Sequence, residues 1–521
     1  MKSAVYKILK KHSSSLFFLF ILGFLYIFLY QIFLPRINAF GCFDDCFNFL
    51  AGYFLSLKKV LYSQIFFNHA PIPAFLSYAI QETTKPINIY DLVLKHRLTL
   101  FFFSSLFNAF LIIRFRFPAF LFAVIFETSK FYLFGDRFLA ESFIVYPLVY
   151  LLGLLVLKFR GEKLFPADYI LSSVSAWFVI FTREPYVPVA AFLFLLVLRK
   201  ASFRNLALSL SVFGMLSLWM LSRFPLHDFF FNVATVNKET ILKFEIEREG
   251  GGFLNRLLSS AGYPFLVFTS DVSGFFKTIL LLLCAGLVVS FIGSIRKSNS
   301  RFLVSLFLVL TLANTRPVAG GAVFYEAFHL LPWYALAIFA TVFLALSLKR
   351  LWLKLIVLLS ILAIPTLMFF SKDSFFFEKI SPHEEFMTNF GPVQEAGSVF
   401  KDLSNGSGTL FLDGFDDLIY WQAKMYSPYE YSWYTSVMPK FEKYTSARLL
   451  MFENNPPDFY YGTCPNVSEV VGFLPDFAKG EYTNIPKDKK PSCVYIRNDV
   501  FSQISNKQWE KVAESGYEKP E

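Results

Sequence analysis

The sequence is poor in charged residues and in cysteine. Only 17% of its 521 residues are Asp, Glu, Lys or Arg, whereas a typical soluble domain has about 25%. Its five cysteines are too few for a fold held together by disulfides. The composition therefore excludes a water-soluble globular fold for the whole chain, and it excludes a small disulfide scaffold.

Apolar residues take the place of the missing charges. They make up 55% of the chain, which contains 69 Phe, and the mean hydropathy is +0.49. Apolar runs of about 18 residues or more recur, as in helices that cross a bilayer. We expect a polytopic α-helical membrane protein with about 11 transmembrane helices, near residues 16–34, 98–113, 119–135, 142–157, 167–182, 186–198, 205–222, 276–295, 302–314, 331–348 and 353–370.

Basic residues gather in the short loops between these spans. The formal net charge of +10 therefore indicates membrane orientation signals rather than nucleic-acid binding. We expect an integral protein of the cell or plasma membrane, with a cytoplasmic N-terminus and 16–34 as an uncleaved signal-anchor. With this orientation the basic loop residues lie inside: Arg114 and Arg116; Lys158, Arg160 and Lys163; Arg199, Lys200 and Arg204; Arg296, Lys297 and Arg301; Lys349, Arg350 and Lys354.

Two long loops then fall on the outer side of the membrane. Residues 35–97 and 223–275 interrupt a transmembrane domain that we place at 1–370. The first loop contains two amphipathic stretches, 47–57 and 72–81. We expect both stretches to lie in the membrane interface with their apolar sides toward lipid.

The tail, residues 371–521, differs in composition from the rest. Strand-like runs at 408–414, 457–462 and 492–497 alternate with polar and helical stretches and with turns. A segment of this length is sufficient for one small domain. We expect a soluble extracytoplasmic α/β domain.

Four of the five cysteines fall in the outer segments. Cys464 and Cys493 lie in the tail, where an oxidising compartment would allow them to pair. Cys42 and Cys46 lie four residues apart in the first outer loop, and either a disulfide or two free thiols fits this spacing. A zinc site there would lack a third strong ligand at a recognised spacing.

An acidic pair, Asp44 and Asp45, lies between these two cysteines. Carboxylates close to a membrane are costly unless they face water or protein, so the pair suggests a functional site. Asp is also common where a helix begins, because it stabilises the helix N-terminus. The pair alone leaves both interpretations open.

The motifs that follow this pair resemble a known family. After Asp44-Asp45 come "LAGYFLSLKKVLY" and "NHAP", the latter at 68–71. The order is similar to the first outer loop of the GT-C superfamily of polyprenyl-phosphate-sugar-dependent glycosyltransferases, which includes protein mannosyltransferases and aminoarabinose transferases. This chain departs from the pattern where Lys58-Lys59-Val60 replaces the usual glycine before "LY", and where Gln64 replaces a frequent Asp.

Two later segments extend the resemblance. The stretch 315–339 resembles the family's late outer loop, in which Arg316, Tyr325 and His329 are the matching polar positions. The Tyr that usually follows the His is missing. The tail segment 408–434 is similar to the family's outer domain.

The resemblance implies a membrane glycosyltransferase. Such an enzyme moves a sugar from a polyprenyl-phosphate donor to an extracytoplasmic acceptor (a glycan, lipid or protein), and the sugar inverts. The resemblance makes Asp44 the base that takes the acceptor's proton. Asp45 is the alternative base, or it contacts the acceptor or a metal with Asp44. A basic residue or a divalent ion, Mg²⁺ or Mn²⁺, would neutralise the leaving phosphate.

The remaining site candidates are polar residues of the outer segments. His69, Arg316, His329 and Tyr325 are expected to bind the donor phosphate. Glu141 is our choice for a second acid, with Asp136 beside it, but an Asp136–Arg137 or Arg137–Glu141 ion pair explains these residues equally well. Arg183 and Glu184 are interpreted as structural.

Two other functions stay open on the sequence. Glu127 and Lys130 lie three residues apart within a span, where they can pair on one helix face. A transporter or lipid flippase would need such charges, although no inverted repeat is found. The third possibility is a membrane scaffold that displays the tail. Membrane lipid is an expected partner in every case, and nucleic acid in none.

Overall fold

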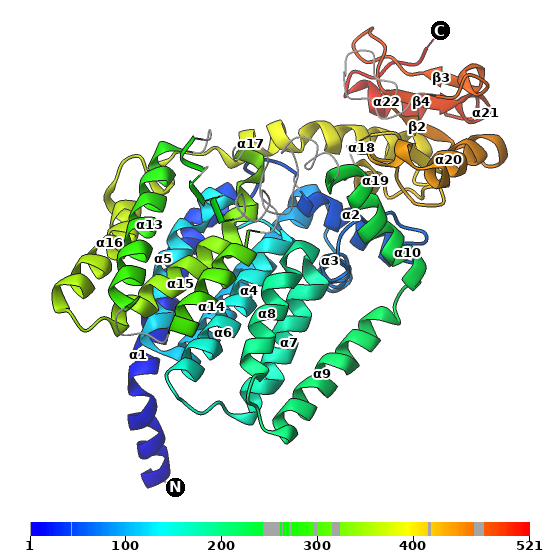
Figure 1. The fold of residues 1–521 in the computed structure, drawn as a ribbon. Helices are drawn as coiled ribbons and strands as arrows, with labels where there is room; N and C mark the ends of the chain where they lie inside the picture. The colour runs from blue at the N-terminus through cyan, green and yellow to red at the C-terminus, as the bar shows by residue number, and fades with distance from the viewer. Residues whose placement is uncertain are drawn as a thin grey trace. The chain divides into compact units, whose positions relative to one another are not determined.

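The computed structural model describes residues 2–42, 44–242, 261–262, 264–265, 267–269, 273–295, 300–314, 324–414, 418–462 and 474–520. The fold is mostly helical, with a small sheet near the C-terminus (Figure 1). The chain forms two compact units. The helical unit comprises Met1–Ile37, Arg97–Met220 and Lys243–Ile380, and the mixed unit comprises Asn38–His96, Leu221–Leu242 and Ser381–Glu521. This division differs from the expected boundary at residue 370, because parts of both long loops belong to the same unit as the tail.

Each of the expected spans coincides with a helix. Most of these helices pack together in the helical unit, whereas α9 lies apart from most of the others (Figure 1). The helices are α1 (Lys2–Phe33), α4 (Ile89–Phe115), α5 (Phe117–Ser129), α6 (Ala140–Phe159), α7 (Pro166–Thr182), α8 (Val187–Leu198), α9 (Phe203–Leu221), α13 (Gly274–Ile295), α14 (Ser300–Leu312), α15 (Leu331–Ser347) and α16 (Leu351–Phe370).

Seven of these helices are long and apolar enough to cross a membrane: α1, α4, α6, α9, α13, α15 and α16. The other four, α5, α7, α8 and α14, have between 12 and 17 residues. A full bilayer core needs about 20 apolar residues. The chain is therefore a polytopic helical membrane protein with seven full-length candidate spans among the described residues, fewer than the eleven expected.

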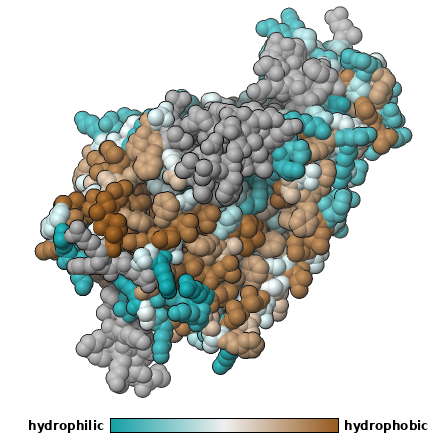
Figure 2. Space-filling view, in the orientation of Figure 1, coloured by the Kyte–Doolittle hydropathy of each residue, from teal (hydrophilic) through white to brown (hydrophobic). Residues whose placement is uncertain are grey.

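The composition of each helix explains its place in the bundle. Helices α6 and α15 are apolar on every side, and they are buried over almost their whole length. A helix of this kind belongs in the centre of a bundle. Helix α1 instead exposes large side chains such as Phe20 and Phe24. Hydrophobic residues dominate much of the visible surface over the helical unit, as expected of a surface in contact with lipid (Figure 2).

Short 3₁₀ turns follow or precede several of these helices. They redirect the chain where the apolar run ends, and Pro occupies the first turn of two of them. The turns are η1 (Leu34–Arg36), η2 (Lys130–Leu133), η3 (Glu184–Tyr186), η6 (Val267–Thr269), η7 (Phe324–Leu330) and η8 (Phe375–Phe377).

The mixed unit surrounds its small sheet with short helices. Its helices are α2 (Asp44–Ser56), α3 (Ile72–Thr84), α10 (Leu226–Phe230), α17 (Pro382–Asn389), α18 (Gly391–Ser404), α19 (Leu418–Ala423), α20 (Glu442–Asn454), α21 (Asn498–Phe501) and α22 (Asn506–Ala513). Two π-helical turns, η4 (Phe231–Val236) and η5 (Lys238–Leu242), and two 3₁₀ turns, η9 (Met438–Lys440) and η10 (Lys479–Glu481), complete the unit.

The sheet has four strands in the order β1-β2-β4-β3. Strand β1 (Leu410–Leu412) pairs in parallel with β2 (Phe459–Tyr461), with Leu410 opposite Phe459. Strand β4 (Val494–Arg497) runs antiparallel to β2 and to β3 (Tyr482–Asn484). The three strand-like runs of the tail are thus confirmed, and β3 is an edge strand that the sequence did not predict.

Helices α2 and α3 cover the two amphipathic stretches of the first loop. They pack closely on each other, and α2 also packs on α19. Gln81 Nε2 donates a hydrogen bond to the Phe49 carbonyl over 2.7 Å, and Trp421 Nε1 donates to Gln81 Oε1 over 2.9 Å. The apolar faces of these helices are therefore buried against protein, whereas we expected them to rest on the membrane interface.

Candidate functional site

The acidic pair lies in the first turn of α2. Cys42 and Cys46 form a disulfide across this turn, with their Cα atoms 5.3 Å apart, which resolves the two alternatives for these cysteines. The Asp44 side chain is 38% exposed, whereas Asp45 is completely buried. The Cys46 backbone N–H donates to Asp45 Oδ1 over 3.1 Å. Both acids stabilise the N-terminus of α2, and only Asp44 is also accessible to a reactant.

His69 lies beside the exposed acid. Its Nε2 is 3.8 Å from Asp44 Oδ2, and its side chain is 13% exposed. Phe47 and Phe67 hold the imidazole edge-on, with ring centroids 5.7 Å from it in both cases. Tyr62 donates its hydroxyl to the His69 carbonyl over 2.8 Å. The sequence-predicted Asp44 and His69 therefore lie together, and aromatic packing fixes the histidine.

The segment that carries His69 is attached to the tail inside the mixed unit. Ser432 Oγ donates to the Gln64 carbonyl over 2.6 Å, and the Phe66 N–H donates to the Tyr431 carbonyl over 3.0 Å. The Trp433 ring stands edge-on to Phe47, with 5.2 Å between centroids. The tail segment thus supports the residues around Asp44. Sequence reasoning missed Trp433, since no spacing rule connects it with Phe47.

Lys59 lies in the same region and is buried. Its Nζ donates to the carbonyls of Ser427 and Tyr429 over 3.2 and 3.3 Å, and it lies 4.5 Å from the Tyr426 ring centroid. Burial lowers the pKa of Lys59 to about 7. Lys59 is thus a buried contact between the first loop and the tail.

The acidic pair offers few ligands for the divalent ion that the sequence suggested for Asp44 and Asp45. No group of three His, Cys, Asp or Glu side chains in the described part of the chain lies close enough to hold an ion. Asp45 is buried and the two cysteines are joined, so Asp44 is the accessible carboxylate of the pair. An ion at Asp44 would take its other oxygen ligands from water and from the donor phosphate.

A second polar cluster lies in the helical unit. Glu141, in the first turn of α6, accepts a hydrogen bond from Arg183 Nε over 2.9 Å, and His329 Nδ1 lies 3.0 Å from the same oxygen. All three residues are almost fully buried. Tyr186 donates its hydroxyl to the His329 carbonyl over 2.9 Å. The second oxygen, Glu141 Oε2, is buried and has no hydrogen-bond partner among the described residues.

The observed contacts decide between the two ion pairs that the sequence suggested for Asp136 and Glu141. Asp136 pairs with Arg137 over 3.6 Å, as one of the two sequence alternatives held. Glu141 pairs with Arg183 and His329 rather than with Arg137, so the other alternative is wrong. Arg183 and Glu141 are 42 positions apart, which is why spacing along one helix could not indicate the pair.

The charges of Glu127, in α5, and of Lys130, in η2, are satisfied by their neighbours. Lys130 Nζ lies 2.6 Å from Glu127 Oε2. Asn108 Nδ2 and the Tyr146 hydroxyl each donate to Glu127 Oε1 over 2.8 Å. A charge in the interior of a bundle is costly unless it is paired and hydrogen-bonded, as both of these charges are. The contacts favour a structural role for Glu127 and Lys130.

Two of the residues expected to bind the phosphate cannot be compared with the site. Arg316 lies outside the described residues. The structure describes Tyr325 by its backbone alone, which belongs to η7. Cys464 also lies outside the described residues, while Cys493 is disulfide-bonded.

Comparison of the chain with protein-family models, with curated proteins and with solved structures finds no match.

Proposed function

We propose that the protein is a membrane glycosyltransferase that moves a sugar from a polyprenyl-phosphate donor to an extracytoplasmic acceptor. One observation carries the proposal: the half-exposed Asp44 carboxylate lies beside His69 on a helix turn that a disulfide closes. The GT-C resemblance of the sequence from Asp44 to Pro71 supports the same assignment.

The proposed chemistry uses Asp44 as a base. The carboxylate takes the proton of the acceptor hydroxyl while the oxygen bonds to the anomeric carbon. The bond from that carbon to the phosphate oxygen breaks, and the electron pair leaves with the polyprenyl phosphate. Attack opposite the leaving group inverts the sugar. We assign to His69, and to Arg316 as the sequence suggests, the role of binding the negatively charged phosphate.

The distribution of cysteines supports an extracytoplasmic position for this site. The disulfide Cys42–Cys46 and the disulfide-bonded Cys493 both belong to the mixed unit. The free thiol of Cys284 is buried in the helical unit. Disulfides persist on the oxidising side of a membrane. We therefore assign the mixed unit to the outer side and the basic loops to the cytoplasm.

The test is turnover of the acid variants by the purified full-length protein. Asp44→Asn keeps a side chain that can stabilise the N-terminus of α2 but cannot take a proton. We expect transfer to fall about 100-fold or more, measured as release of polyprenyl phosphate from a panel of polyprenyl-phosphate monosaccharides. Glu82→Gln, an exposed acid of α3, is the matched control and should retain activity. Asp136→Asn should have a smaller effect than Asp44→Asn.

Two outcomes would contradict this proposal. Equal turnover of Asp44→Asn and the unmodified protein would reject the base assignment. Movement of the lipid-linked sugar across vesicles without its consumption would instead identify the transporter or flippase alternative.

A further inference from the structure

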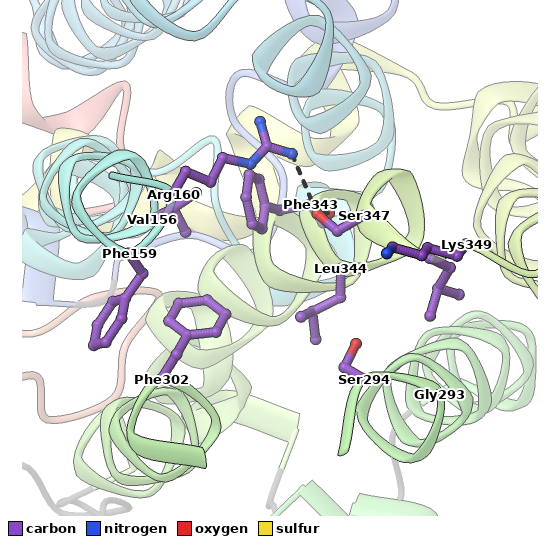
Figure 3. Close-up of a pocket in the computed structure, with 11 residues that line it drawn as sticks. Val156, Phe159, Arg160, Gly293, Ser294, Phe302, Phe343, Leu344, Ser347 and Lys349 are labelled. Atoms are coloured by element: carbon purple, nitrogen blue, oxygen red, sulfur yellow. Dashed lines mark hydrogen bonds between the residues drawn. The ribbon is translucent and has the colours of Figure 1, made fainter. Parts of the chain in front are cut away.

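Two cavities flank the end of α6 that is remote from Glu141. Helix α6 has 20 residues, so its ends are about 30 Å apart. The larger cavity has a volume of about 400 Å³ and opens between the last turns of α6, α13 and α15 and the start of α14 (Figure 3). The smaller one, of about 220 Å³, lies on the other side of Phe159, next to the end of α8.

The charged residues that line both cavities are all basic. Arg160 and Lys349 line the larger cavity, and Lys158, Arg199, Lys200 and Arg301 line the smaller one. No acidic residue is among the described residues that line either cavity. Within the described part of the chain, Arg160 and Lys349 form no ion pair. Such a concentration of one charge in a recess attracts an anion.

Arg160 is held in place at the larger cavity. Its guanidinium carbon lies 4.2 Å above the centroid of the Phe343 ring, and its Nη2 donates to Ser347 Oγ over 3.2 Å. Figure 3 shows this bond, with Lys349 farther along the same side of the opening. Stacking and the hydrogen bond orient the planar guanidinium, and its remaining N–H groups are suited to phosphate oxygens.

Apart from Ser294 and Ser347, the other residues that line the cavity are apolar. Phe159 and Phe302 lie with 4.9 Å between ring centroids, and Leu344 and Val156 continue the lining. An apolar wall beside a basic rim, at the end of membrane-crossing helices, matches a molecule with a charged head and a hydrocarbon chain. A soluble anion would use the rim alone.

We propose that the larger cavity binds the phosphate group of an anionic phospholipid, with Arg160 and Lys349 on the phosphate and an acyl chain along Phe159 and Phe302. In the membrane orientation proposed above, the basic loops that carry these residues lie on the cytoplasmic side. The site is independent of sugar transfer, since none of its residues belongs to the proposed chemistry.

The experiment compares two double variants of the full chain in uncharged detergent. Arg160→Gln with Lys349→Gln removes the two cavity charges. Lys163→Gln with Arg350→Gln removes one Lys and one Arg from the same two loops, at exposed positions that do not line the cavity. Dioctanoylphosphatidylglycerol, dioctanoylphosphatidylcholine and inorganic phosphate are the three probes. A Ser347→Trp variant keeps both charges and fills the opening.

We expect the dissociation constant for phosphatidylglycerol to rise about tenfold or more in the cavity variant and less than about twofold in the matched control. The Ser347→Trp variant should also bind it more weakly, and phosphatidylcholine should bind the unmodified protein more weakly than phosphatidylglycerol. Equal affinity of both double variants would overturn the site. Inorganic phosphate binding as tightly as the lipid would overturn the lipid as ligand.

Discussion

At the scale of single residues, the two neighbouring acids of α2 have different surroundings. Asp44 is partly exposed and lies near His69, whereas Asp45 is fully buried. A buried carboxylate contributes to stability through the hydrogen bonds that it accepts. The two positions should therefore respond differently to the same change from carboxylate to amide.

We predict that Asp45→Asn lowers the unfolding free energy of the protein by about 1–3 kcal/mol. Asp44→Asn should change it by less than about 1 kcal/mol, because its carboxylate is partly hydrated. Thermal unfolding of the two variants in detergent measures the difference. If Asp44→Asn were the more destabilising change, Asp44 would have a mainly structural role.

Glu141 offers a second test in the helical unit. Glu141→Gln removes the negative charge next to Arg183, and both side chains are almost fully buried. Removing one partner of a buried ion pair costs about 3–5 kcal/mol. We predict a loss of stability of that order, read from the unfolding midpoint. Glu162→Gln, at an exposed loop position, is the control and should behave like the unmodified protein.

A pH effect follows from a buried lysine of the mixed unit. Burial lowers the pKa of Lys59 to about 7. The unfolded chain keeps its lysine protons up to pH 10.5, so it binds more protons than the folded chain above pH 7. The unfolding free energy should therefore rise with pH from about 7 upward.

We predict that the unfolding free energy rises by at most about 1.4 kcal/mol per pH unit because of Lys59. Unfolding midpoints between pH 7 and 9 measure it, below the range in which tyrosines of the unfolded chain ionise. In Lys59→Met the slope should be smaller. A slope that is unchanged in Lys59→Met would mean that this lysine stays charged in the folded protein.

At the scale of the elements, the contact between α2 and α3 depends on one glycine. A Cβ at Gly52 would lie 2.5 Å from Ser77 Oγ and 2.7 Å from the Tyr78 backbone nitrogen. The backbone of α3 cannot move away without losing its own packing. The glycine of "LAGYFL" thus has a steric explanation.

Gly52→Ala should therefore destabilise the mixed unit, by about 1–3 kcal/mol. Gly480→Ala is the matched control, because a Cβ there meets nothing within 4 Å. Limited proteolysis of the two variants would show the difference. Equal resistance of both to proteolysis would mean that α2 and α3 separate easily.

The sequence predicted the elements better than their contacts. Long apolar runs identified the positions of the spans, because lipid requires a helix of about 20 apolar residues. Strand β3, three residues at the sheet edge, gave no comparable pattern. For the candidate sites, Asp44 and His69 came from one local motif, whereas His329 and Glu141 are 188 positions apart. No periodicity connects residues at that separation, so their contact needed the structure.

At the scale of the whole molecule, the clustered basic residues and the disulfides lie in different parts of the chain. Arg160, Arg199 and Lys349 belong to one set of helix ends, and the disulfides belong to the mixed unit. The positive-inside rule and the redox rule then predict the same orientation. Agreement of two independent rules makes the orientation a sharp prediction.

We predict that Lys507→Cys, exposed on α22, reacts with a membrane-impermeant maleimide in intact cells. Lys163→Cys, exposed in the loop after α6, should react only after the membrane is permeabilised. Both positions are exposed, so labelling reports the compartment. The opposite labelling pattern would place Asp44 in the cytoplasm and remove the basis of the proposed sugar transfer.

The bond between Cys42 and Cys46 makes the acidic turn sensitive to how the chain is produced. The same polypeptide synthesised in a reducing extract would lack this closure, and its first turn of α2 would sample more conformations. Such material could insert into lipid normally while holding Asp44 less firmly. Preparations made with and without an oxidant would then differ in turnover although they have the same sequence and the same amount of inserted protein.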